Sequence, residues 1–149
     1  MSIRGIFFNM QQTTAADHGL IFSRAVSDRV MSGGQVTNTY NTVFINAGFV
    51  MMGGRVWEIQ GNEAVSVSNT GGYAYARIKA QIDLTQASTG ADNFQQVNFV
   101  VEYASDLEEF ADLVTDAINT GGGSIYEKEA ALVSIDSESG ITAIVRKWA

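Results

Sequence analysis

The sequence contains no cysteine and no proline among its 149 residues, and His18 is the only histidine. Without cysteine the chain can form neither a disulfide bond nor a thiolate metal site. Without proline its turns must be made by residues such as Gly, Asn, Asp and Ser, and glycine is abundant with 15 copies. A single histidine also leaves few ways to build a metal centre or a Ser–His–Asp triad.

Basic residues are scarce as well. The chain has 9 Lys and Arg against 16 Asp and Glu, which gives a formal net charge of -7. Because nucleic acid and anionic membranes repel such a surface, we expect neither as a partner. No apolar run approaches the ~20 residues of a membrane-spanning helix, so we expect no membrane insertion. The length and the 46% hydrophobic fraction predict one domain over residues 1–149.

The clearest local signal lies in residues 42–68, TVFINAGFVMMGGRVWEIQGNEAVSVS. Apolar side chains alternate in the first ten positions and predict one strand, with Val43 and Phe49 on the same face. Gly53-Gly54 predicts a tight hairpin of primed type, because both glycines tolerate positive φ. Gly61-Asn62 predicts a second turn before a third strand. We therefore expect three adjacent strands of one sheet here.

Other stretches also alternate between apolar and polar residues. They predict long antiparallel strands over residues 73–84, 95–103 and 129–136 and a last short strand over residues 141–145. The first two of these strands are expected to pair as a hairpin with a long connection. In residues 73–84 the alternation predicts one buried face and one solvent-facing polar face.

Two stretches predict helices. Thr14 and Asp17 form a capping pattern for a helix that Ser32 and the following glycines end, and its packed stripe is Ile21, Phe22, Ala25 and Val26. Ser105 and Glu108 form a capping box for a second helix through residue 118. Its solvated face carries the acids Glu108, Glu109, Asp112 and Asp116. The expected fold is α+β, mainly β: an antiparallel sandwich or partial barrel with two short helices.

The acids of the second predicted helix and His18 are the main candidates for chemistry. Two carboxylates can act as acid and base if their environments separate their pKa values, but these acids follow the wet face of a helix. His18 has no second His or Cys with which to share a metal. No calcium loop, P-loop or G-x-S-x-G motif is present. We expect no catalytic residue, no cofactor, no metal and no enzymatic activity.

Aromatic side chains are the remaining candidates for binding. Tyr73 and Tyr75 lie on the polar side of their predicted strand, and Tyr73, Tyr75 or Trp57 could provide a platform for stacking on sugar rings. The same side chains could pack against another subunit, or the N-terminal helix could cover them. The sequence leaves these alternatives open.

Several short motifs follow one another along nearly the whole chain. They are GIFFN at residues 5–9, TAAD at 14–17, GGRVW at 53–57, NEAVSV at 62–67, ARI at 76–78, IDL at 82–84, YE at 126–127 and AALV at 130–133. In this order the chain resembles a structural module that begins many baseplate and tail-fibre proteins of siphophages and of prophages of Gram-positive bacteria.

The resemblance implies a mostly β, oligomeric virion protein, with a trimer as the favoured order, that contacts other tail or baseplate proteins. We expect Ile3, Ile6, Phe7 and Phe8 to form its contact region; the alternative is that they complete the sheet. A second hypothesis is a module that binds cell-wall saccharide during host recognition. Many relatives continue beyond the position of Ala149 into a fibre or carbohydrate-binding domain, which makes direct host recognition the weaker hypothesis here.

Overall fold

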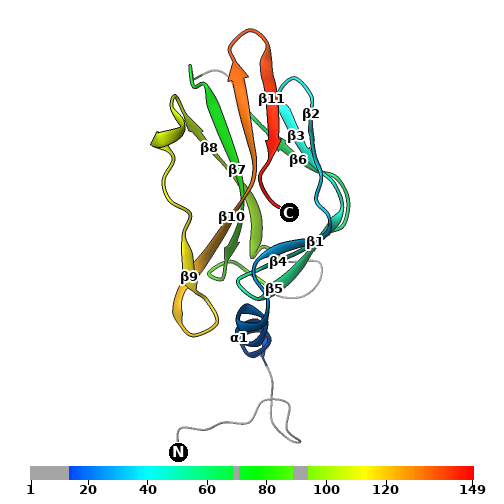
Figure 1. Cartoon of the computed structure of the whole chain (residues 1–149), viewed down its shortest axis with the longest axis vertical. Coiled ribbons are helices and arrows are strands. Elements are labelled where there is room, and N and C mark those ends of the chain that lie inside the picture. The colour runs from blue at the N-terminus through cyan, green and yellow to red at the C-terminus, as the bar shows by residue number, and fades with distance from the viewer. Residues whose placement is uncertain (1–13, 69–70, 89–93) are drawn as a thin grey trace, which may run out of the picture.

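β-strands dominate the computed structural model, which describes residues 14–68, 71–88 and 94–149 (Figure 1). All strand pairs among these residues are antiparallel. The predicted mainly-β class is therefore confirmed. The expectation of two helices is wrong for the described part of the chain, which contains one α-helix and a single 3-10 turn.

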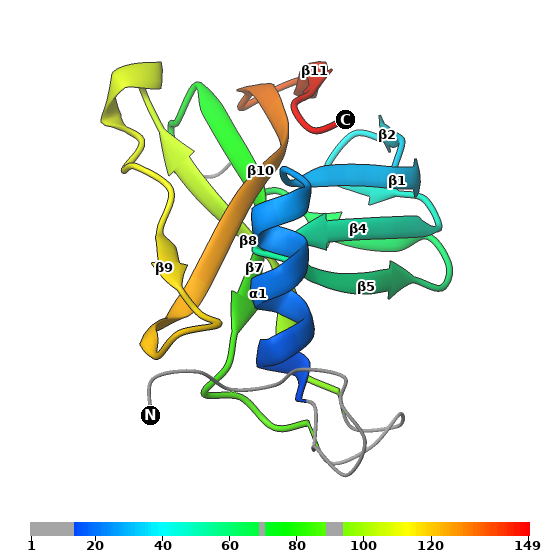
Figure 2. The same cartoon turned by 60° about the horizontal axis from the view of Figure 1, so that its bottom comes forward.

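The first half of the chain forms a three-stranded meander that bends in its middle (Figures 1 and 2). One arm has the order β1-β4-β5 and the other the order β2-β3-β6. The strands are β1 (Arg29–Gly33), β2 (Val36–Asn38), β3 (Thr42–Ile45), β4 (Gly48–Met52), β5 (Arg55–Ile59) and β6 (Glu63–Ser66). The register runs through the bend, because Gly33 pairs with Gly48 and Val36 with Ile45. The two small sheets are thus two arms of one folded meander.

This bend corrects the prediction of three adjacent strands over residues 42–68. The first predicted strand splits between β3 and β4, and the inward face changes there: Val43 is fully buried, whereas Phe49 is 44% exposed and Val50 is buried. Gly61-Asn62 lies at the corner between β5 and β6. Because β5 pairs with β4 and β6 pairs with β3, both strands stay beside the same bent strand. Period-2 alternation could not show this change of phase, because apolar residues occupy both faces of the strand after the corner.

Polar backbone contacts hold the corner. The Asn46 carboxamide accepts a hydrogen bond from the Gln35 N–H at 2.7 Å, and the Asn46 N–H donates to the Gln35 carbonyl at 3.0 Å. Gly33 and Gly34, on the neighbouring strand, have φ values of +63° and +66°. A residue with a side chain adopts this conformation rarely, so glycine permits the sharp turn between β1 and β2.

The predicted Gly53-Gly54 hairpin is confirmed. Met52 pairs with Arg55 across the turn, and the two glycines have φ values of +56° and +76°. Positive φ at both central residues is the requirement of a primed turn, whose twist matches that of the flanking strands.

The second half of the chain forms a larger sheet with the order β11-β10-β7-β8. Its strands are β7 (Tyr75–Asp83), β8 (Val97–Ala104), β10 (Gly122–Asp136) and β11 (Gly140–Arg146), and β9 (Thr115–Ala117) pairs with the first part of β10. The predicted pairing of the two alternating strands is confirmed, since Tyr75 lies opposite Ala104 and Ile82 opposite Val97. The predicted last strand is confirmed as β11.

The meander and the larger sheet enclose the core. Three rings form its aromatic centre: Trp57, Phe99 and Trp148 have centroids 5.9 to 6.1 Å apart. Trp148 is 1% exposed and donates its indole N–H to the Gly34 carbonyl at 2.9 Å. The C-terminal residues therefore join the β11 side of the larger sheet to the β1–β2 side of the meander.

Helix α1 (Ala15–Ala25) begins where the capping pattern predicts. The Thr14 hydroxyl accepts from the Asp17 N–H and the Asp17 carboxylate accepts from the Thr14 N–H. The helix ends earlier than predicted, because residues 29–33 are paired as β1. The predicted apolar stripe is wrong in part: Ile21 and Val26 are half-buried, but Phe22 is 44% exposed, and the fully buried residues of the helix are Asp17 and Gly19. The helix crosses beside the Gly53-Gly54 turn (Figure 2), and a Cβ at Gly54 would collide with the Gly19 carbonyl oxygen.

The second predicted helix is wrong. Only the turn η2 (Leu107–Glu109) coils, and Asp106 caps it through the Glu108 N–H. The chain then runs extended, because its polar groups bond to distant strands. The Val114 N–H donates to the Glu127 carboxylate at 2.9 Å, and the Ala111 carbonyl accepts from Arg77 at 2.6 Å. These tertiary bonds outweigh the local helix propensity of a short segment.

Candidate functional site: a groove between two strand edges

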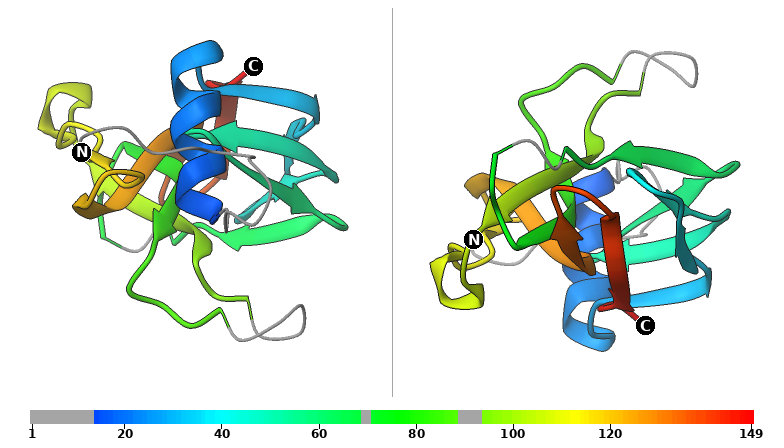
Figure 3. Two further views of the ribbon diagram at one scale, coloured as in Figure 1. Left: turned by 90° about the horizontal axis from the view of Figure 1, so that it is seen from below. Right: turned by 90° about the horizontal axis from the view of Figure 1, so that it is seen from above.

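The two sheets are joined along one side and open along the other. Figure 3 shows the meander and the larger sheet end-on. On the closed side, Arg146 donates to the Gly33 carbonyl at 3.0 Å and the Val30 N–H donates to the Ala149 carbonyl at 3.0 Å. On the open side, β5 and β6 are the edge strands of the two arms of the meander, and β8 is the edge strand of the larger sheet. No strand among the described residues pairs with these outer edges.

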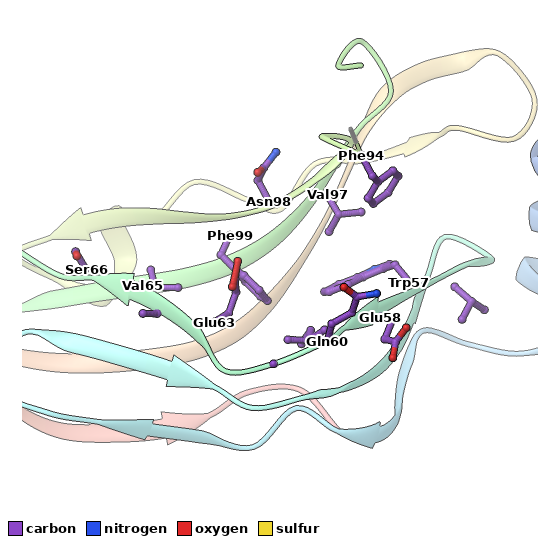
Figure 4. A pocket seen from close by; sticks show the side chains of 14 residues that line it. Trp57, Glu58, Gln60, Glu63, Val65, Ser66, Phe94, Val97, Asn98 and Phe99 are labelled. Carbon is purple, nitrogen blue, oxygen red and sulfur yellow. The ribbon is translucent and has the colours of Figure 1, made fainter. Parts of the chain in front are cut away.

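A groove of about 860 Å³ lies between these edges. Its floor is apolar, from the buried Trp57, Ile59 and Val65 and from the half-buried Phe99. Its rim is polar and includes Glu58, Gln60, Glu63, Ser66 and Asn98 (Figure 4). The volume falls within the range of protein ligand pockets, and an apolar floor with a polar rim is typical of binding sites.

The groove continues toward α1. A second hollow of about 380 Å³ shares Val56, Trp57, Phe94 and Val97 with it and is also lined by Ala15, His18 and Phe22. The first turn of the helix therefore lies at the lower end of one elongated depression.

Two electrostatic features distinguish the groove. Glu58 and Glu63 line it, and no Lys, Arg or His does so among the described residues, whereas Arg55 and His18 line the adjoining hollow. Trp57 is 9% exposed, and its indole N–H has no hydrogen-bond acceptor within the described chain. A buried donor without an acceptor costs about 1–3 kcal/mol.

A cluster of buried charges lies on the outer face of the larger sheet, where the sequence predicts a solvated strand face. Arg77 and Lys79 on β7 are each 7% exposed, and Glu127 on β10 is 3% exposed. The Lys79 ammonium pairs with Glu127 at 2.7 Å and with Glu102. Arg77 pairs with Glu102 at 2.7 Å. The prediction of a wet face is wrong because residues 107–114 cover it.

The cluster shifts the pKa values of its members. Burial alone raises the pKa of the Glu127 carboxyl, but hydrogen bonds from Lys79, the Val114 N–H and Gln81 hold it below its ordinary value. Burial alone lowers the pKa of Lys79, but Glu102 and Glu127 hold it above its ordinary value. Lys79 and Glu127 are therefore both held in their ionised forms within the cluster. Because Glu127 accepts from three groups, the cluster fastens the covering segment and offers no uncommitted acid or base.

A third hollow, of about 710 Å³, lies between the end of α1 and the β9–β10 turn. Tyr126 donates its hydroxyl to Asp28 at 2.6 Å, and the other Asp28 oxygen accepts from the Gly53 N–H at 2.8 Å. Burial of the hydroxyl raises the pKa of Tyr126, and the hydrogen bond to the charged Asp28 raises it further. These polar groups anchor the hairpin turn against β10.

The structure does not bring the predicted aromatic platform together. Tyr73 is 44% exposed and packs on Tyr103 with ring centroids 5.7 Å apart, whereas Trp57 packs on Phe99 in the core. Phe99 and Tyr103 are four residues apart on one strand, which separates them by roughly 13 Å. Tyr75 is half-buried. The other predicted contact residues, Ile3, Ile6, Phe7 and Phe8, lie outside the described residues.

The candidates for acid–base or metal chemistry lie apart from one another. Asp116 accepts from the Ser124 and Ile125 N–H groups and Glu109 from the Ser105 N–H. His18 is exposed on α1. Across the three described ranges, no group of three or more His, Cys, Asp or Glu could hold a metal ion. The one described helix is also too short and too polar to cross a membrane.

Sequence reasoning missed the groove and the buried charges. The groove depends on which strand edges face each other, which alternation does not specify. A usable signal for the buried charges is present: Arg77 and Lys79 alternate on one strand, and Glu102 alternates with apolar residues on its predicted hairpin partner. Comparison with known proteins gives no further guide, since no family model and no curated protein matches the chain.

Proposed function

We propose that the protein is a non-enzymatic structural component of a phage or prophage tail, located in the virion, which acts by contacts with other tail or baseplate proteins and with its own copies. The observation that carries the proposal is the open side of the molecule. The edges of β5, β6 and β8 have no strand partner in the described chain, and a groove with an apolar floor and a polar rim lies between them. Edges of this kind pair readily with another chain.

Exposed apolar side chains support the same proposal. Met31, Phe49 and Val56 lie on the β1-β4-β5 arm and are 57%, 44% and 49% exposed. Phe49 and Val56 share a face, because Phe49 pairs with Glu58, two residues along β5 from Val56. Large apolar side chains gathered on one face are typical of protein–protein contact sites. The order of the GIFFN, GGRVW and NEAVSV motifs supports the tail assignment and, by the same resemblance, a trimer.

The test is the composition of particles. Prophage induction in a bacterium that encodes the chain, followed by density-gradient purification of the particles, should leave its peptides in the particle fraction at a fixed ratio to tail proteins. Particles that lack the chain while it accumulates free in the lysate would contradict the proposal. Particles from a strain without tail genes are the matched control.

A second candidate is a module that binds cell-wall saccharide. The exposed Tyr73 ring packed on Tyr103 favours it, because adjoining aromatic rings can stack on sugars. The protein should then sediment with purified cell walls, and Tyr73→Ala should release it, while Phe49→Ala on the other sheet should not. Wild-type protein that stays in the supernatant would exclude this candidate.

A further inference from the structure

We propose that the groove between β5–β6 and β8 receives a β-strand from a second copy of the chain, and that this strand is residues 3–8. The inference rests on the proposed assembly function and names the contact that performs it. Residues 3–8 lie outside the described residues, so the argument rests on the acceptor groove and on the sequence of the donor.

The backbone argument comes first. Each strand edge presents unpaired N–H and C=O groups at alternate residues, and adjacent strands lie about 4.8 Å apart. A strand placed in the groove can pair with one of these edges. At one end the Ser68 N–H already reaches across to the Tyr103 hydroxyl at 2.7 Å, so the two edges converge there. An extended peptide is therefore the shape of ligand that the groove fits.

The floor of the groove specifies apolar side chains. Trp57, Val65 and Phe99 form it. Successive side chains of a strand point to opposite faces, so either Phe7 or Phe8 faces the floor in whichever register the strand binds.

The rim specifies the charge of the donor. Glu58 and Glu63 line the groove without a basic residue beside them in its described lining. Residues 1–13, MSIRGIFFNMQQT, carry Arg4 as their only charged side chain. Donor and acceptor thus have opposite charge, which aids encounter and fixes orientation more than it adds affinity.

The donor joins the described chain beside the groove, and we infer from the proposed assembly of copies that it enters the groove of a second copy. It precedes Thr14, the cap of α1, and Ala15 and His18 line the lower end of the same depression. Each copy thus carries a donor next to its own acceptor. A head-to-tail exchange of this kind closes into a ring when the rotation between copies allows it, as in a trimer. The donor of the same copy is the competing occupant, and the experiment separates the two.

Cysteine cross-linking provides the test, because the chain has no cysteine of its own. A chain carrying Ile6→Cys is mixed with a chain carrying Asn98→Cys, on the exposed rim of β8, and mildly oxidised. We expect a covalent dimer whose linked peptides join positions 6 and 98, at least tenfold above the yield with Thr142→Cys, an exposed position on β11. A yield no higher than with Thr142→Cys would overturn the inference.

The double variant with Ile6→Cys and Asn98→Cys in one chain tests the competing occupant. At high dilution it should stay uncross-linked, and an intramolecular disulfide there would overturn exchange between copies. Oligomeric protein without the 6–98 link would reject this inference and leave the proposed function standing. Monomeric protein absent from purified particles would reject the proposed function itself.

A peptide competition makes the result independent of disulfide chemistry. A synthetic peptide with residues 1–13 should change the tryptophan fluorescence of a chain carrying Phe7→Asp and Phe8→Asp, whose own donor is disabled. The same peptide with both phenylalanines changed to Asp is the control and should have no effect. Equal responses to the two peptides would overturn the role given to the phenylalanines and, with it, the inference.

Discussion

The ammonium of Lys79 lies 2.7 Å from the carboxylate of Glu127, and the two side chains are only 8% and 2% exposed. They belong to neighbouring strands, β7 and β10, that pair along most of their length. Glu127 also accepts from the Val114 N–H, and its own N–H donates to the Val114 carbonyl at 2.8 Å. The ion pair thus connects two central strands with the extended segment that covers them.

Breaking this pair should destabilise the fold strongly. Lys79→Met leaves Glu127 charged, buried and without its cation, and removing one partner of a buried pair costs about 3–5 kcal/mol. Urea unfolding followed by the fluorescence of Trp57 and Trp148 would measure the loss. The exposed Lys147→Met is the control and should change the free energy of unfolding by less than about 0.5 kcal/mol. Equal midpoints for Lys79→Met and wild type would contradict the assigned role.

Stability should depend on pH in two separate windows. The pKa of Glu127 is lower in the folded than in the unfolded chain, so its contribution is present above the ordinary value of 4.5 and is lost as pH falls through the folded value. The pKa of Lys79 is raised, so its contribution is complete below 10.5 and is lost as pH rises through the folded value. We expect a plateau of the free energy of unfolding between these limits.

Lys79→Met provides the matching control for the pH profile. Without the cation, the pKa of Glu127 should rise toward its ordinary value, and stability should fall less steeply below pH 4.5 than in wild type. Chemical unfolding at a series of pH values checks both windows. Parallel acid limbs for the two proteins would show that Lys79 does not hold the carboxylate in its ionised form.

The contact between α1 and the hairpin turn should tolerate no side chain. Gly54→Ala forces a non-glycine residue to a φ of +76° and drives its Cβ into the Gly19 carbonyl oxygen. We expect a loss of about 1–3 kcal/mol, the usual cost of such a strained residue. Gly61→Ala, where a Cβ would have no neighbour within 4 Å, should be nearly neutral. Similar thermal midpoints for the two variants would contradict the close packing of helix and turn.

Self-association should depend on the acids of the groove. Replacing Glu58 and Glu63 with Gln removes the charges that would attract Arg4. The association constant should therefore fall about threefold to tenfold, and it should depend less on the salt concentration. Glu138→Gln, at the exposed β10–β11 turn, should leave both unchanged. Sedimentation velocity at two salt concentrations measures the effect. Identical association constants for the groove and turn variants would show that the acids of the groove do not contribute to assembly.

Local signals predicted the local features of this fold. The Gly53-Gly54 turn, the capping box at Thr14 and the pairing of β7 with β8 all appear as expected. Each depends on residues within a few positions of one another. Where propensity and tertiary hydrogen bonding agree, the sequence pattern is sufficient.

Long-range contacts decided the rest. Residues 107–114 carry a helix pattern, yet Arg77 and Glu127 hold them extended from strands distant in sequence. The corner at Asn46 depends on Gln35, from the adjacent strand. The groove arises only because the edges of β5 and β8 face each other after the sheets have packed. None of these relations leaves a periodic trace in the chain.

The mass of the full chain in solution tests the central claim most directly. Light scattering across a wide concentration range should give a defined multiple of 16.0 kDa, and Phe7→Asp with Phe8→Asp should reduce it toward a single chain. A wild-type mass of 16.0 kDa that persists at the highest concentrations would contradict a protein that works by assembling with its own copies.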